Sequence, residues 1–284
     1  MDASSEIRRR GGAATRQQLI AAGLSGYDLT RAVRTGEILR CRQARYVLPD
    51  TSRQIIAAVT VGGLLAGPSA ARTYGLWAGL DARLHLSVGN NSSRLRMTSF
   101  RSLAPELVIH WLKGGATPEL GPECWRVPFA TCVRQVVEWC DVETGLACVE
   151  TAMTSRRLGA QRIAAIFASQ PSRSRAIAGR ARPGCDSGAE SIVGQRLGRL
   201  GVAVQRQVVI AGVGRVDMVV LGSRLVIEVD GRVYHQDPSA FEEDRRRDAE
   251  LAARGYAVVR LSYARVMFDW PWCERVVREA LRAA

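Results

Sequence analysis

The sequence predicts an α/β (α+β multidomain) protein with a small helix-turn-helix module and wing, a mixed α/β middle region, and a C-terminal mixed sheet flanked by helices. Three observations support this fold class. Two helix-start signals stand close together near the N-terminus, helices and strands mix through the middle, and residues 186–284 follow the order α-β-β-β-α-β-α. We therefore predict domains at residues 1–50, 51–170 and 186–284, with a basic linker at residues 171–185.

The charge of the chain predicts a nucleic-acid partner. The 284 residues carry a formal net charge of +13, and a hydrophobic content of 47% describes a globular protein. Residues 186–284 hold 15 Arg against 14 acidic residues, so nearly all of the excess positive charge lies in residues 1–185. An arginine-rich composition without a binding role is the alternative, but DNA contact explains the charge better.

Cysteine usage and hydropathy predict a cytoplasmic location. Seven cysteines include no C-x-x-C pair, which favours reduced thiols. No secretory signal follows the basic residues 8–10, and the longest apolar run, residues 55–66, is too short to cross a bilayer. We therefore expect no membrane partner.

Residues 6–50 predict two short helices followed by a two-stranded wing. Thr15 with Gln18, and Ser25 with Asp28, fit the capping box, in which two residues three positions apart satisfy free backbone N–H groups. Each helix ends at a glycine. The strands of the wing are expected at residues 37–40 and 45–48.

Arginines of the second helix and the wing are expected to contact nucleic acid, because arginine binds phosphates and guanine edges. They are Arg31, Arg34, Arg40, Arg42 and Arg45. The segments T-R-Q-Q-L-I-A-A-G-L-S, R-A-V-R-T-G-E-I-L-R and R-Y-V-L-P resemble the winged helix of the AbiEi-type antitoxins. That resemblance implies DNA binding, and a winged helix that contacts another protein is the alternative.

The middle region predicts a scaffold without a catalytic constellation. Helices are expected at residues 51–66, 69–77, 129–138, 144–155 and 161–169, and strands at residues 84–88 and 107–112. This order resembles the region that follows the winged helix in the same antitoxin-like proteins. A toxin-like protein or a second copy of this chain is the partner expected here. The polar, basic residues 171–185 are expected to form a solvated connector.

Acidic residues on two neighbouring apolar strands predict a site in the C-terminal part. Glu228 and Asp230 are two positions apart on the strand at residues 224–230, so their side chains share a face. Asp217 lies on the strand at residues 215–221, which a short turn joins to the first as a hairpin. Buried carboxylates need a cation or a hydrogen-bond donor.

The surrounding elements predict a partly parallel sheet. A helix at residues 241–254 connects the strand at residues 224–230 to one at residues 256–261, and such a crossover joins parallel strands. Helices are also expected at residues 186–200 and 274–284.

The motifs G-A-E-S, R-V-D-M-V-V, V-I-E-V-D-G-R-V-Y-H and D-R-R-R-D-A-E-L-A-A-R-G-Y-A-V-V-R-L resemble a domain family related to the very-short-patch-repair mismatch endonuclease, within the PD-(D/E)XK nuclease fold. The resemblance implies that Glu190, Asp217 and Glu228 bind Mg²⁺ and activate water. Asp230 stands where the wider pattern has lysine. The repair-endonuclease branch also lacks that lysine and has a histidine beyond the glycine, so His235 is the candidate base.

Hard carboxylate oxygens select Mg²⁺ or Mn²⁺, which Asp217, Glu228 and Asp230 are expected to hold. Asp244 and Asp248 lie four residues apart on one helix face, and nearby arginines can hold a phosphate. We therefore add Asp244 and Arg247 to the catalytic set and Arg245 to the nucleic-acid-binding set. A solvated run of helical salt bridges is the alternative for these residues.

These features predict a metal-dependent DNA endonuclease with duplex docking by the N-terminal module. The rival hypothesis is a DNA-binding regulator or antitoxin-like protein whose nuclease-like domain is inactive, since the usual lysine is absent. Action on RNA also stays open.

Overall fold

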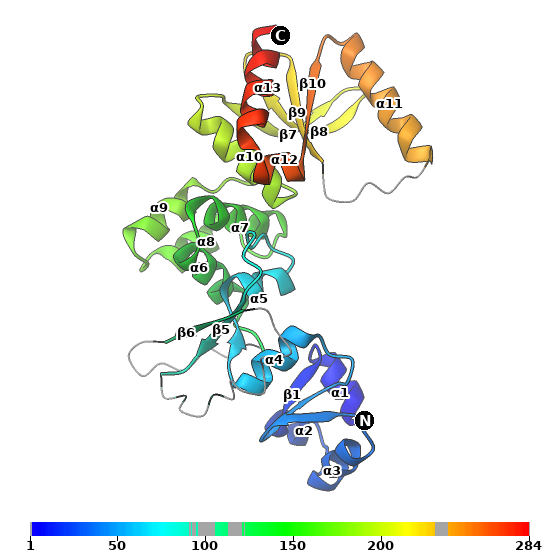
Figure 1. Cartoon of the computed structure of the whole chain (residues 1–284), viewed down its shortest axis with the longest axis vertical. Helices are drawn as coiled ribbons and strands as arrows, with labels where there is room; N and C mark the ends of the chain where they lie inside the picture. Colours follow the sequence, from blue (N-terminus) through cyan, green and yellow to red (C-terminus); the bar gives the residue numbers. More distant parts are fainter. Residues whose placement is uncertain are drawn as a thin grey trace. The chain divides into compact units, whose positions relative to one another are not determined.

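The computed structural model describes residues 2–90, 92, 95, 106–112, 121, 123–230 and 238–283, with the backbone alone at residues 238–241 and 244. The chain divides into two compact units, Met1–Cys140 and Asp141–Ala284, coloured by sequence in Figure 1. This division falls inside the predicted middle region of residues 51–170. The helices expected near its end therefore belong to the C-terminal unit.

The N-terminal unit begins with three helices and a three-stranded sheet. They are α1 (Ala3–Arg9), β1 (Ala13–Thr15), α2 (Arg16–Ala21), α3 (Gly26–Arg34), β2 (Leu39–Arg42) and β3 (Arg45–Val47), with strand order β1-β3-β2. Both predicted capping boxes are present. Thr15 Oγ1 accepts from the Gln18 N–H at 3.0 Å, and Ser25 Oγ accepts from the Asp28 N–H at 3.1 Å. The two short helices and the following strand pair form as predicted, whereas α1 and β1 were not foreseen.

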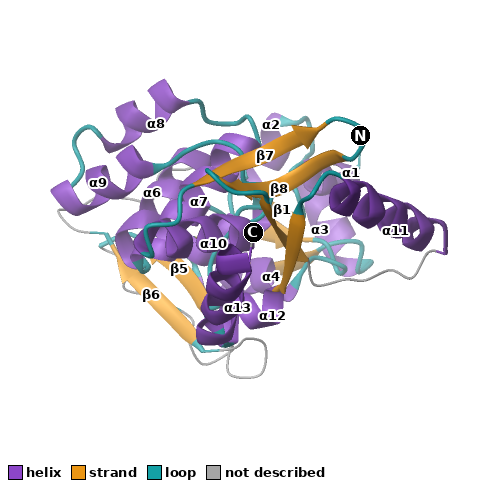
Figure 2. Ribbon diagram, turned by 90° about the horizontal axis from the view of Figure 1, so that it is seen from above, coloured by secondary structure: helices purple, strands orange, loops and turns teal. Residues whose placement is uncertain are grey.

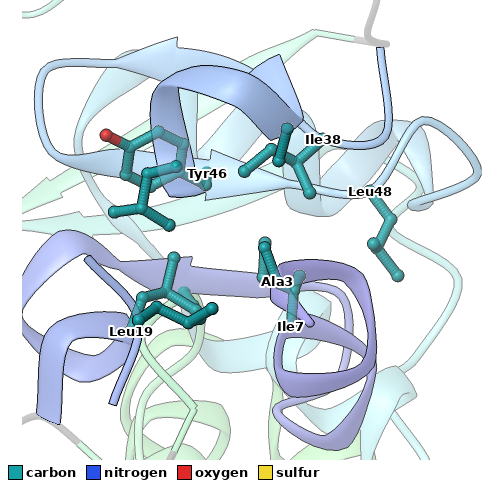
Figure 3. Close-up of a cluster of buried hydrophobic side chains, with 10 residues drawn as sticks. Ala3, Ile7, Leu19, Ile38, Tyr46 and Leu48 are labelled. Carbon is teal, nitrogen blue, oxygen red and sulfur yellow. The ribbon is translucent and has the colours of Figure 1, made fainter. Parts of the chain in front are cut away.

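A cluster of buried apolar side chains holds these elements together. Figure 3 shows Ile7 of α1, Leu19 of α2 and Tyr46 of β3 in this cluster. Ile7 and Leu19 are 0% exposed, and burial of such a side chain stabilises by roughly 1.5–3 kcal/mol. Helices this short depend on packing rather than on their own propensity.

The rest of this unit is a small α/β region. Its elements are α4 (Arg53–Val61), β4 (Leu64–Leu65), α5 (Gly67–Thr73), β5 (Leu84–Val88), β6 (Leu107–Trp111) and α6 (Phe129–Trp139). The strand order is β4-β5-β6, with β5 parallel to β6. The prediction of one helix at residues 51–66 is wrong beyond Val61. Gly62 ends α4 at φ 96°, a conformation that glycine adopts without a Cβ clash.

The C-terminal unit opens with four helices, α7 (Val142–Thr154), α8 (Ala160–Phe167), α9 (Ser172–Arg180) and α10 (Gly188–Arg199). The prediction of a solvated linker at residues 171–185 is wrong, because α9 occupies most of it. Ser174, Ile177 and Ala178 are buried, and their spacing gives α9 one inward stripe. Figure 2 shows α9 beside α8.

A four-stranded mixed sheet completes the C-terminal unit. Its strands are β7 (Val204–Ile210), β8 (Gly214–Val220), β9 (Leu225–Asp230) and β10 (Ala257–Ser262), in the order β10-β9-β8-β7. Strands β8 and β9 are antiparallel and β9 and β10 parallel, as the hairpin and the crossover predicted. The crossover helix is α11 (Pro238–Ala253), and α12 (Tyr263–Phe268) and α13 (Trp270–Ala283) follow β10. Figure 1 shows α10 and α13 on one side of the sheet and α11 on the other.

Helix α11 packs against the sheet through a buried leucine. Leu251 is fully buried and lies in one apolar cluster with Val216 and Val226.

Within the described residues, no helix is long and apolar enough to cross a membrane.

Candidate active site and nucleic-acid interface

Strands β8 and β9 bring two of the predicted acids together. The register of the two strands pairs Met218 with Ile227. Continued by one residue on each strand, the same register sets Asp217 across from Glu228. Residues that are opposite in an antiparallel pair share a face of the sheet. The Asp217 Oδ2 atom also accepts a hydrogen bond from the Val229 backbone N–H at 2.8 Å. Both carboxylates therefore lie at one place in the sheet.

The carboxylate of Glu228 lies between two guanidinium groups. Arg247 of α11 donates from Nη2 to Oε1 at 2.6 Å, and Arg260 of β10 donates from Nε to Oε2 at 3.1 Å. Glu228 is 8% exposed, whereas the Arg247 and Arg260 side chains are 28% and 30% exposed. Two half-buried cations thus offset the cost of burying this acid.

Arg260 is the residue of this cluster that the sequence analysis missed. It stands beside Glu228 in the parallel register of β9 and β10. Its Nη1 atom donates to Asp248 Oδ2 at 2.9 Å, and its Nη2 atom donates to Asp248 Oδ1. These bonds lower the pKa of Asp248 and join two strands to α11. The available signal was an arginine inside the apolar segment V-V-R-L, since such a charge needs a partner.

Glu190 and Asp217 form no ion pair within the part of the chain that the structure describes. Glu190 is 6% exposed, and its Oε2 atom accepts from the Asp186 N–H at 2.9 Å and from Gln207 Nε2 at 3.0 Å. Burial raises the pKa of Glu190, and the charge of Asp217 raises it further. Burial also raises the pKa of Asp217, against the opposing Val229 hydrogen bond. Desolvated acids close to each other favour a cation.

The donor atoms present suit a hard cation in their chemistry. Among the described residues, Asp217 Oδ1 and the carboxylate of Asp230 accept no hydrogen bond, so these oxygens are available. Glu228 differs, because both of its oxygens are bonded to arginines. No three His, Cys, Asp or Glu side chains of the described residues lie close enough together to hold a metal ion. Of the three predicted metal ligands, Asp217 and Asp230 therefore have free oxygens, whereas Glu228 is bonded to arginines.

The structure does not describe all of the other predicted catalytic and nucleic-acid-binding residues of this unit. His235 and the Asp244 side chain lie outside the described residues, so their roles stay predictions. Arg245 is exposed on α11. Arg246 forms an exposed pair with Glu243 at 2.6 Å, which is the solvated salt bridge that the sequence left open.

The predicted nucleic-acid-binding arginines of the N-terminal unit separate into two groups. Three of them are exposed on α3 and β2, namely Arg31, Arg34 and Arg40. Arg42 instead donates from Nη1 to the Val61 carbonyl at 2.7 Å and holds the end of α4. Arg45 is half-buried. Arg31, Arg34 and Arg40 are therefore the predicted arginines whose guanidinium groups are accessible to a ligand.

Two separate parts of the chain match family models, an AbiEi antitoxin-like one at the N-terminus and a restriction-endonuclease-like one at the C-terminus. The matches to family models identify them more closely. Residues 1–48 match the family described as "Transcriptional regulator, AbiEi antitoxin", and residues 190–281 match REase_MTES_1575. The resemblances of the N-terminal segment and of the C-terminal part are confirmed at this level, whereas neither match covers the middle region. Domains of the restriction-endonuclease-like class generally depend on a divalent metal.

One solved structure is also similar to part of the chain. The catalytic domain of the homing endonuclease I-Bth0305I is 22% identical in sequence and covers 34% of this chain and 94% of its own, with a TM-score of 0.30. That TM-score is too low for the likeness to bear on the site. The comparison with curated proteins gave no match.

Proposed function

We propose that this protein is a DNA endonuclease that hydrolyses phosphodiester bonds with Mg²⁺ or Mn²⁺ and docks duplex DNA through its N-terminal domain. The observation that carries the proposal is the hydrogen bond from the Val229 N–H to Asp217, which ties this acid to the strand of Glu228, with Arg247 2.6 Å from the Glu228 carboxylate. Acids that hold a cation beside an arginine that holds a phosphate are what phosphodiester hydrolysis requires.

The residues divide this work by their chemistry. Asp217 and Asp230 offer the free carboxylate oxygens that would hold the cation. Glu228 would become the third ligand only by leaving Arg247, because no three described acids lie close enough together in this structure. A divalent cation bound there lowers the pKa of a water and stabilises the leaving oxygen. Arg247 lies at the Glu228 carboxylate and orients the scissile phosphate. His235 is proposed as the group that takes the proton from the attacking water.

Docking of the duplex rests on the N-terminal unit. Exposed arginines on α3 and β2 present guanidinium groups to solvent, and the excess positive charge of the chain lies in residues 1–185. The family that residues 1–48 match is described as a transcriptional regulator, which supports DNA as the partner. Binding of this kind weakens steeply as salt rises, because phosphate contacts release counterions.

A supercoiled-plasmid nicking assay with Mg²⁺ or Mn²⁺ tests the proposal. Asp217→Asn and Glu228→Gln should each lower the nicking rate by roughly a hundredfold or more. Glu243→Gln is the matched control, because it removes an exposed acid of α11 that pairs only on the surface with Arg246. Equal rates for wild type and both site variants would refute the assigned roles.

The second candidate is a DNA-binding regulator, or an antitoxin-like protein, with an inactive nuclease-like domain. It is favoured by the double arginine pairing of Glu228 and by Asp230 at the position where the nuclease pattern has lysine. Calorimetric titration with Mn²⁺, together with duplex binding measured by fluorescence anisotropy, separates the two. Tight duplex binding without metal uptake supports the regulator.

A further inference from the structure

The two arginines at Glu228 are held very differently. Arg260 uses Nε for Glu228 and both terminal nitrogens for Asp248, so its planar group is fixed between β9 and α11. Arg247 bonds only through Nη2, which reaches Glu228 Oε1 and the Arg215 carbonyl. Its Nε atom is buried and has no hydrogen-bond partner among the described residues.

An unsatisfied guanidinium N–H in a buried position calls for an acceptor. The edge of arginine formed by Nε and a terminal nitrogen binds two oxygens of a phosphate side by side, and contacts through Nη2 alone leave the Nε half of that edge unused. Arg247 can leave Glu228 at the cost of two contacts made by one nitrogen. Arg260 cannot leave Glu228 without also disturbing its bonds to Asp248.

Resting on the proposed function, we propose that Arg260 is a positioning residue that keeps Glu228 in place, whereas Arg247 is an exchangeable counter-ion. Arg247 gives up Glu228 Oε1 to a divalent cation and takes oxygens of the DNA phosphate through Nε and the Nη2 atom thus released. Two guanidinium groups and a divalent cation on one carboxylate repel one another, so the less firmly held arginine leaves. Metal binding and phosphate binding are thereby coupled through one side chain.

The test compares Mn²⁺ binding by the full chain and by two variants that each remove one positive charge from the same carboxylate. Arg247→Gln should tighten Mn²⁺ binding by roughly tenfold or more, because a competing cation is lost. Arg260→Gln should weaken it, because Glu228 loses the group that orients it. Arg246→Gln, one residue away on α11 and paired only on the surface with Glu243, should leave the affinity unchanged.

A second readout should move in the opposite direction. Arg247→Gln should slow plasmid nicking although it binds Mn²⁺ more tightly, and Arg247→Lys should return the Mn²⁺ affinity toward that of wild type. Hydrogen exchange on the wild-type chain is independent of any variant. Mn²⁺ together with uncleaved duplex should alter exchange of α11 peptides around Arg247 and leave β10 peptides around Arg260 protected.

The outcomes separate this inference from the function on which it rests. Equal tightening by Arg247→Gln and Arg260→Gln would mean simple charge competition and would overturn the division of roles. Unchanged Mn²⁺ affinity in Arg247→Gln, with a wild type that binds Mn²⁺ and nicks DNA, overturns only the inference. No Mn²⁺ uptake by any of these proteins overturns both.

Discussion

Neutral substitutions at Glu228 and Asp217 should change stability in opposite directions although the two side chains are neighbours. Glu228→Gln removes the charge that Arg247 and Arg260 share. Each hydrogen bond to a charged group contributes about 1.5–3 kcal/mol. The substitution also removes the cost of burying a charged carboxylate, which offsets part of the lost stability. The arginines are 28% and 30% exposed, so solvent screening reduces it further. We expect a loss of about 1–2 kcal/mol in the free energy of unfolding.

Asp217→Asn should instead stabilise the protein at neutral pH. Burial raises the pKa of Asp217 above its ordinary value of 3.8, so the carboxyl contributes stability below that pH and loses it as the pH rises through the folded pKa. At neutral pH the ionised group therefore costs stability. The uncharged amide avoids this cost and can still accept the Val229 N–H.

Urea unfolding of the full chain, combined with hydrogen exchange of β8 and β9 peptides, measures both effects within the C-terminal unit. The advantage of Asp217→Asn should shrink as the pH is lowered from about 7.5 toward the ordinary carboxyl pKa. Glu279→Gln is a control at an exposed acid that pairs with Arg275 on the surface of α13. Destabilisation by both site substitutions at neutral pH would refute the reasoning. Pairing with a counter-ion would then not determine whether the free energy of unfolding rises or falls.

Three further outcomes follow from the contacts. Thr15→Ala removes an N-cap of α2 and should cost about 1 kcal/mol, measured by thermal or urea unfolding. Arg34→Ala should weaken duplex binding and reduce the slope of the logarithm of the binding constant against the logarithm of salt concentration by about one, measured by anisotropy at several salt concentrations. Arg42→Ala should instead lower mainly the stability, because Arg42 loses its hydrogen bond to the end of α4. Leu251→Ala should cost about 2–5 kcal/mol and increase exchange along α11, because this leucine is fully buried.

The acids on β8 and β9 were predictable because their signal is local. An alternating apolar strand places Glu228 and Asp230 on one face, and a short turn makes its neighbour antiparallel, so Asp217 comes close without tertiary information. Arg260 could not be placed in this way. Its partner Asp248 lies on α11, and only the parallel register of β9 and β10 decides which acid stands beside it.

The missed helix α9 has a different cause. Its segment S-R-S-R-A-I-A-G-R is polar and flanked by proline and glycine, so periodicity gave little signal. Ile177 and Ala178 are nevertheless buried and α9 packs against α7 and α8, and this tertiary packing outweighs the weak local preference. Arg42 was assigned to DNA for a similar reason, since the sequence shows a charge but not the Val61 carbonyl that accepts from it.

The acid at position 230 is the strongest objection to nuclease chemistry, and the charge balance around it answers the objection. A lysine there would offset the negative charge of the neighbouring acids. In this chain, Arg247 and Arg260 supply two positive charges from α11 and β10, and these balance Glu228 and Asp248. Asp217 and Asp230 then have two negative charges without an ion-pair partner among the described residues, which is the charge that one divalent cation neutralises. In the proposed reaction, Arg247, Arg260 and the cation would therefore supply the positive charge that the wider pattern takes from a lysine at this position.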